Sequence, residues 1–295
     1  MNATLPLAAA LERALTAALD ARSDLWWVRE TTDPAEVAHP RCLCLPVADR
    51  AAVGLAVGLA WSGARVVVDV AATGRLPALV EVLAEAARPR TGLPCRLVLR
   101  VPLGGELGAL EGPWVDLLAG VHGLRVVCPR DAAQGEALLA AALEADGPVV
   151  LLEPRAVERG VAGSSAALGD AVTLRAGADV VLLGWGAALE AAVPVCEALA
   201  REGVDAGLVD LVSLAPLDGR ALAEAVSATG RAAVVRLSAA QEPGSDAVAA
   251  RVVAEATRAA FWSLEAPVVA LEVGARPPEA VAARLLDVLD LLESP

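Results

Sequence analysis

Short apolar runs alternate with longer segments of helical periodicity along the first half of the chain. Apolar residues recur at helical spacing in segments 5–21, 51–61, 75–87 and 131–144, with a shorter helix at 114–119. Between the helical segments lie runs of four to six apolar residues that fit buried strands, at 25–29, 42–46, 65–70, 96–101, 124–127 and 148–152. This alternation predicts an α/β fold, in which helices cover both faces of a mostly parallel sheet.

The second half of the chain opens with a βαβ unit. An apolar run at 180–183 ends in the turn Gly184-Trp185-Gly186, an alanine-rich helix follows to residue 202, and a second apolar run occupies 206–211. A crossover of this length predicts two parallel strands joined in the right-handed sense. Further strands are predicted at 231–237 and 267–273, and further helices at 246–261 and 279–292.

The segment 158–170 is rich in Gly, Ala and Ser and shows no strong periodicity, which is typical of a linker. We therefore expect two α/β domains, each with a mostly parallel sheet covered by helices. The first would occupy residues 1–157 and the second residues 171–295. A length of 295 residues is enough for two buried cores.

Composition narrows the classes of function. Hydrophobic residues make up 56% of the chain but aromatic residues only 2%, so the cores must consist of Ala, Val and Leu. A net charge of −13 argues against a nucleic-acid-binding protein and against binding to an anionic membrane. No apolar stretch reaches the roughly 20 residues of a membrane span, and no basic region precedes an apolar stretch at the N-terminus. Five scattered cysteines fit reduced thiols. We expect a cytoplasmic protein.

Several short stretches occur in an order that resembles one family. The second half carries Gly-Ala-Asp at 177–179, V-D-L at 209–211 and S-L-A-P-L-D at 213–218. The first half carries L-P-V-A-D at 45–49 before a Gly-x-x-x-Gly helix, RVPLGG at 100–105, a G-L-x-V-x-x-P stretch at 123–129 and a D-x-P-V-x-x-x-E-P stretch at 146–154. Together they resemble the beta subunits of thiamine-diphosphate-dependent 2-oxo acid dehydrogenases, a family that shares its domain plan with transketolase.

The resemblance implies a pyrimidine-binding domain followed by a transketolase C-terminal-like domain. It also implies a function. The chain would be the beta-type subunit of a two-component enzyme that acts on a 2-oxo acid or ketol donor, by decarboxylation or by acyl or ketol transfer, with carbon–carbon bond formation as a further option. The active site would be shared with an alpha-type subunit in an α2β2 assembly. Thiamine diphosphate and magnesium would be bound mainly by that partner, so no metal ligands are expected in this chain.

The resemblance also implies site residues. Asp49 stands where the family has a glutamate that contacts the pyrimidine ring, and we expect it to act both in catalysis and in cofactor binding. Its side chain is one methylene shorter, and it could also cap the helix that follows. The family's aromatic residue near the pyrimidine corresponds here to Ala71, Ala72 or Thr73, of which we take Ala72 as the cofactor-binding candidate. Gly104 and Gly105 belong to the family's glycine-rich loop. No histidine follows that loop, so His122 is the candidate replacement.

These departures leave a second function open. A chain that lacks the glutamate, the aromatic residue and the histidine could be a catalytically silent homologue that scaffolds or regulates an active partner.

Two weaker patterns point to other chemistry. His39, Cys42 and Cys44 are spaced like metal ligands, but they are more simply explained as buried thiols on a strand. Gly184 and Gly186 form only half of a dinucleotide-binding fingerprint.

Overall fold

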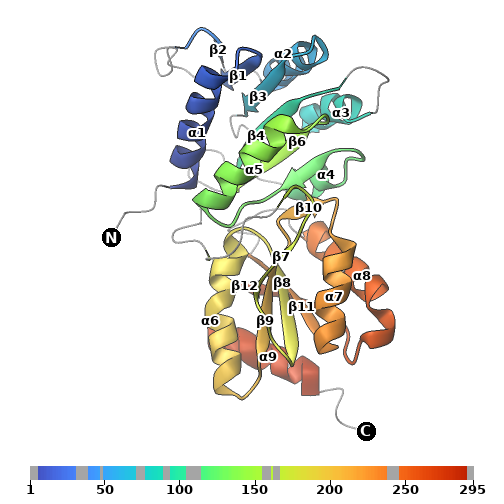
Figure 1. Ribbon diagram of the computed structural model, residues 1–295. Helices are drawn as coiled ribbons and strands as arrows, with labels where there is room; N and C mark the ends of the chain where they lie inside the picture. Colours follow the sequence, from blue (N-terminus) through green and yellow to red (C-terminus); the bar gives the residue numbers. More distant parts are fainter. Residues whose placement is uncertain are drawn as a thin grey trace.

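The structure is a computed structural model that describes residues 6–30, 39–46, 49–70, 77–88, 94–103, 114–154, 161, 167–237 and 246–290. Two sheets, each flanked by helices, lie one above the other in Figure 1. The first sheet has seven strands in the order β10-β5-β6-β4-β3-β1-β2. The second has five strands in the order β12-β11-β8-β9-β7. The predicted fold class, two α/β domains, is confirmed.

The first sheet is parallel except for its edge strand β10, which runs antiparallel to β5. Its strands are β1 (Leu25–Glu30), β2 (Cys42–Leu45), β3 (Arg65–Asp69), β4 (Leu97–Leu103), β5 (Arg125–Val127), β6 (Val149–Pro154) and β10 (Ser213–Ala215). Helices α1 (Leu7–Ala21) and α5 (Ala132–Glu144) pack together over one face. Helices α2 (Asp49–Trp61), α3 (Pro77–Ala86) and α4 (Trp114–Ala119) cover the other.

Spacing in the sequence explains the face that α1 buries. Leu7, Leu11, Leu15 and Leu19 recur every four residues, and all are buried against the sheet and α5. Helix α5 begins as expected from its sequence, because the side chain of Asp131 accepts a hydrogen bond from the backbone N–H of Gln134 at 2.7 Å.

The second sheet is parallel except for β7, which pairs antiparallel with β9. Its strands are β7 (Val172–Arg175), β8 (Val180–Gly184), β9 (Ala206–Asp210), β11 (Ala232–Leu237) and β12 (Val269–Val273). Helices α6 (Ala187–Arg201) and α9 (Pro278–Asp290) pack together on one face, and α7 (Gly219–Thr229) and α8 (Asp246–Ala259) on the other. The predicted βαβ unit is β8-α6-β9, and its strands are parallel.

The predicted strands and helices are all present, with ends within two residues of those expected. Strands β7 and β10 and helix α7 were not predicted. The short strand β10 contains only three residues, and it reaches across from the second half of the chain to extend the first sheet. Within the described ranges, no helix is both long and apolar enough to pass through a lipid bilayer.

Candidate functional site

The carboxyl ends of β1, β2, β3, β4 and β6 share one edge of the first sheet, because these strands are parallel. In open α/β sheets this is the edge where ligands bind. Strand β2 ends at Leu45 and α2 starts at Asp49, so Asp49 begins the helix that follows β2 at this edge. Strands β3 and β4 also end here, at Asp69 and Leu103. The three segments predicted to contact the cofactor, which contain Asp49, Ala72 and Gly104, therefore all follow strands that end at this edge.

The structure does not describe every predicted site residue. Asp49 is the first residue of α2, but its side chain lies outside the described set. Ala72, Gly104 and Gly105 also fall outside the described residues. His122 is exposed in the turn before β5, at the amino ends of the strands and thus at the opposite edge of the sheet. The structure does not bring His122 together with the start of α2.

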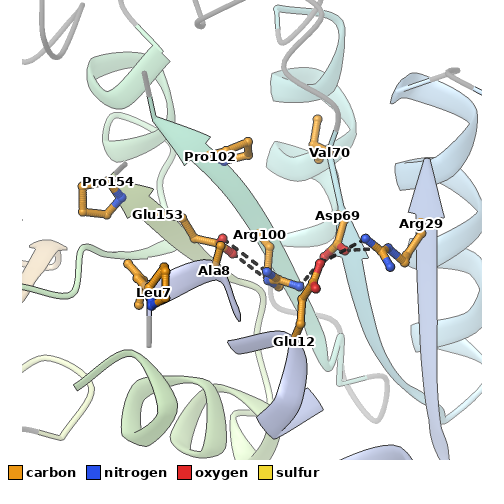
Figure 2. Close-up of a pocket in the computed structure, with 11 residues that line it drawn as sticks. Leu7, Ala8, Glu12, Arg29, Asp69, Val70, Arg100, Pro102, Glu153 and Pro154 are labelled. Carbon is orange, nitrogen blue, oxygen red and sulfur yellow. Dashed lines mark hydrogen bonds and ion pairs between the residues drawn. The ribbon is translucent and has the colours of Figure 1, made fainter. Parts of the chain in front are cut away.

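Four charged side chains form a connected row at the carboxyl edge: Arg29, Asp69, Arg100 and Glu153 (Figure 2). Arg100 lies between the two carboxylates. Its Nε donates to Oε1 of Glu153 at 2.6 Å, and its Nη1 donates to Oδ1 of Asp69 at 3.0 Å. Asp69 Oδ2 lies 3.4 Å from Arg29 Nε and accepts a hydrogen bond from Trp27 Nε1 at 3.0 Å. We call these four residues the Arg100 network.

The strand register explains why these side chains meet. Arg29 is opposite Asp69, and Asp69 is opposite Arg100, so all three leave the sheet on the same face. Two residues earlier on each strand, the same face carries the buried side chains of Trp27, Val67 and Val98. The apolar core of this face thus ends in a row of charges at the carboxyl edge.

Helix α1 covers the network and leaves a cavity of about 420 Å³ beside it. Leu7, Ala8 and Glu12 project from α1 into the lining (Figure 2). Glu12 also binds the network directly, with its Oε1 3.1 Å from Nη2 of Arg29. The same contacts that shape the cavity therefore tie α1 to the sheet.

Burial shifts the protonation of the network. It raises the pKa of Asp69 to about 6; Arg100 opposes this rise and Glu153 adds to it. Burial acts to lower the pKa of Arg100, but Asp69 and Glu153 outweigh it and raise that pKa above its ordinary value. The guanidinium of Arg100 is therefore a fixed positive charge beside the carboxyl group of Asp69, which titrates near pH 6. Such a group can hydrogen-bond a ligand in either protonation state.

Arg100 and Glu153 belong to stretches already noted in the sequence, RVPLGG and the E-P strand, but their pairing was not predicted. Asp69 was missed altogether. Its signal was a carboxylate at the end of a strand whose other residues are mostly apolar.

The histidine and cysteines with metal-ligand spacing fit a structural role. Nδ1 of His39 accepts a hydrogen bond from the backbone N–H of Arg41 at 3.1 Å. Burial and the neighbouring Cys44 raise the pKa of the Cys42 thiol to about 12, which keeps it protonated. Among the residues that the structure describes, no three His, Cys, Asp or Glu side chains are placed to hold a metal ion.

Comparison with known proteins identifies the family. Residues 9–159 match the pyrimidine binding domain of transketolase, and residues 169–292 match the transketolase C-terminal domain. The chain is 30% identical to the pyruvate dehydrogenase E1 component subunit beta of Leifsonia xyli subsp. xyli, in an alignment that covers 90% of this chain and 85% of that one. It is 29% identical to the 2-oxoisovalerate dehydrogenase subunit beta of Bacillus subtilis, over 79% of this chain and 74% of that one. The chain belongs to the transketolase-like family of 2-oxo acid dehydrogenase beta subunits.

Solved transketolase structures share the fold. A split-gene transketolase, described as an inactive β4 tetramer, superposes with a TM-score of 0.78 at 20% identity, and the match covers 98% of this chain and 99% of that one. A transketolase mutant from Pichia stipitis superposes with a TM-score of 0.73 at 15% identity, over 99% of this chain and 47% of that one. At these identities the likeness concerns the fold alone.

The Gly184-Trp185-Gly186 turn, which in the sequence resembles half of a dinucleotide-binding fingerprint, lies in a crowded place in the structure. A Cβ on Gly186 would lie 2.6 Å from Sγ of Cys128 and 3.5 Å from Cγ of Pro154, both within the part of the chain that matches the pyrimidine binding domain. The backbone of Gly186 also has a φ of 51°. This glycine permits close contact between the two halves of the chain.

Proposed function

We propose that the chain is the beta-type subunit of a two-component, thiamine-diphosphate-dependent enzyme that acts on a 2-oxo acid or ketol donor. The observation that carries the proposal is the position of Asp49, which begins α2 at the carboxyl edge of a sheet with this family's fold. The names of the relatives, pyruvate and 2-oxoisovalerate dehydrogenase beta subunits, support decarboxylation of a 2-oxo acid as the reaction class.

We assign the pyrimidine end of the cofactor to this edge. A carboxylate at the start of α2 would accept a hydrogen bond from the pyrimidine ring and so orient the ring. Binding and orienting the cofactor is what the protein contributes to the reaction. When bound, thiamine diphosphate supplies the carbanion chemistry beside a carbonyl group. The segment with Ala72 and the loop with Gly104 and Gly105 would line the ring. We assign the diphosphate and the magnesium ion to the partner.

The exposed face of α2 supports an alpha-type partner in an α2β2 assembly. Gly54 and Gly58 are four residues apart and both exposed, and a Cβ added at either would meet no atom within 4 Å. Leu55 beside them is 39% exposed. Small residues at this spacing let a second helix approach the backbone closely, so this face is suited to a helix of the partner.

The positions of the two histidines favour a second function, that of a catalytically silent subunit. The chain has two, and both precede strands: His39 comes before β2 and His122 before β5. Neither is therefore at the carboxyl edge, where the family would use a histidine. If no other residue takes over the role of the family's histidine, the chain is a catalytically silent beta-like subunit that scaffolds or regulates an active partner.

An activity screen separates the two functions. The chain would be co-purified with an alpha-type subunit encoded beside it, supplied with thiamine diphosphate and magnesium, and assayed for release of CO2 from a panel of 2-oxo acids. An active subunit predicts turnover that falls about a hundredfold or more in Asp49→Ala. Glu224→Ala, an exposed change on α7, is the control and should leave turnover unchanged. A stable complex with no turnover on any donor, or turnover indifferent to Asp49→Ala, would contradict the catalytic role.

A further inference from the structure

The second sheet has a hollow of its own, formed by residues of the C-terminal half of the chain. It measures about 200 Å³ and is lined by Arg236, Ala270, Leu271, Glu272, Arg276, Ala280, Val281 and Arg284. Arg236 is the fifth of the six residues of β11, so the hollow opens at the carboxyl ends of β11 and β12. This is again the edge of an α/β sheet where ligands bind.

The hollow is positively charged, whereas the chain as a whole is negatively charged. Three of its eight lining residues are arginines and one is a glutamate, whereas the chain carries a net charge of −13. Asp246 lies 2.7 Å from Arg236 Nη2, and Glu272 lies 3.9 Å from Nη1. These contacts hold the guanidinium of Arg236 in place, and its side chain is only 19% exposed. The hollow therefore has one anchored arginine on its sheet side.

The other two arginines are not neutralised within the part of the chain that the structure describes. Neither Arg276 nor Arg284 has a carboxylate within 4.0 Å there, although 15 other arginines do. Arg276 lies in the bend just before α9 and Arg284 lies on α9, and both line the hollow together with Ala280. Two like charges that face one hollow favour an anion between them.

We propose that this hollow binds the phosphate group of a phosphorylated small molecule, at a site separate from the cofactor edge. Guanidinium groups offer paired N–H donors that match a phosphate in two-pronged contacts. The volume is below the roughly 300 Å³ at which pockets enclose a whole ligand, so the hollow holds the phosphate while the rest of the ligand projects outward. A dianion suits the two unneutralised arginines better than a single carboxylate does.

Titration calorimetry of inorganic phosphate into the full chain at low ionic strength tests the proposal, with no thiamine diphosphate present. We expect one phosphate per chain, and binding about tenfold weaker in each of Arg276→Gln and Arg284→Gln. Arg220→Gln removes the same charge from an 84% exposed arginine on α7 and should leave the affinity unchanged. Thermal unfolding confirms that the variants are folded, which is expected because both arginines are exposed.

Acetate at the same ionic strength should bind at least tenfold more weakly than phosphate. The proposal is overturned if phosphate does not bind, if Arg220→Gln weakens binding as much as the two hollow variants, or if acetate binds equally well. None of these results depends on the cofactor or on the partner subunit, so they leave the proposed function untouched.

Discussion

Arg130 and Asp210 join the two halves of the chain through a buried ion pair, with 2.7 Å between Nη1 and Oδ2. Their side chains are 1% and 0% exposed. Gln134 donates a second hydrogen bond to Oδ2 of Asp210 at 2.9 Å, and the backbone N–H of Val212 donates to Oδ1 at 2.9 Å. Asp210 is the aspartate of the V-D-L stretch, so a residue that marks the family in the sequence serves here to fasten the second half of the chain to the first.

Removing one partner of this pair should destabilise the protein strongly. Asp210→Asn leaves the guanidinium of Arg130 buried without its closest carboxylate, and we expect a loss of about 3 kcal/mol or more in the free energy of unfolding. Asp146→Asn is the control, because Asp146 pairs with Arg96 but is 78% exposed, and such pairs contribute about 1 kcal/mol or less. Urea unfolding measures both. Equal effects of the two variants would contradict the role given to the buried pair.

The raised pKa of Asp69 predicts a pH dependence of stability. Because its pKa is about 6 in the folded protein and 3.8 ordinarily, the folded state binds this proton more tightly than the unfolded chain. The contribution of Asp69 to the free energy of unfolding is therefore full below about pH 4, falls as the pH rises through about 6, and is lost by about pH 7. The Asp69→Asn variant has no carboxyl group at this position, so its stability does not have this pH dependence.

We expect the difference in stability between Asp69→Asn and the unchanged protein to shift in favour of the variant by roughly 1 kcal/mol between pH 5 and pH 8. Urea unfolding at several pH values measures it. Parallel profiles for the two proteins would show that Asp69 does not titrate in this range.

Gly186 should tolerate no side chain. Gly186→Ala would place Cβ 2.6 Å from Cys128 Sγ and impose a φ of 51° on a residue that disfavours it. Gly203→Ala has the same kind of backbone strain, with a φ of 82°, but meets no atom within 4 Å. We expect Gly186→Ala to cost at least about 1 kcal/mol more than Gly203→Ala in thermal or urea unfolding. If both variants lose the same stability, the contact with Cys128 has no energetic weight.

Gly58 should affect the isolated chain and its assembly in opposite directions. Gly58→Ala improves helix propensity in an open site, so we expect the chain alone to gain up to about 1 kcal/mol in stability. The added methyl group would at the same time weaken the complex with an alpha-type subunit, as measured by light scattering of the co-purified chains. Ala133→Leu enlarges an exposed residue on α5 and serves as the control. Unchanged assembly of Gly58→Ala would exclude this face of α2 from the interface.

Much of the fold could be predicted because the elements are long or strongly patterned. The leucines of α1 and the buried runs of β6 and β8 leave little choice of structure. Helix α7 was missed although its signals are present: Asp218 accepts a hydrogen bond from the backbone N–H of Ala221 at 3.0 Å, and Gly230 ends the helix in the left-handed conformation. Strand β10 has no comparable signal, because three residues do not establish a period.

The candidate site was predictable only in part. The predicted cofactor residues Asp49, Ala72 and Gly104 come after strands that the hydrophobic pattern identifies, so the sequence alone assigns them to one edge of the sheet. The Arg100 network depends instead on register between strands, and no pattern within a single strand reveals that Arg100 lies between Asp69 and Glu153. His122 was chosen for its residue type alone, and a turn before β5 lies at the other edge.

Titration calorimetry of thiamine diphosphate with magnesium tests the central claim most directly. The chain would be co-purified with its alpha-type partner, and Asp49→Ala and Glu224→Ala would be titrated beside it. We predict saturable binding that weakens about tenfold or more in Asp49→Ala and is unchanged in Glu224→Ala. Binding that is absent, or that is equally strong in Asp49→Ala, would contradict the placement of Asp49 at the cofactor and would favour the silent subunit.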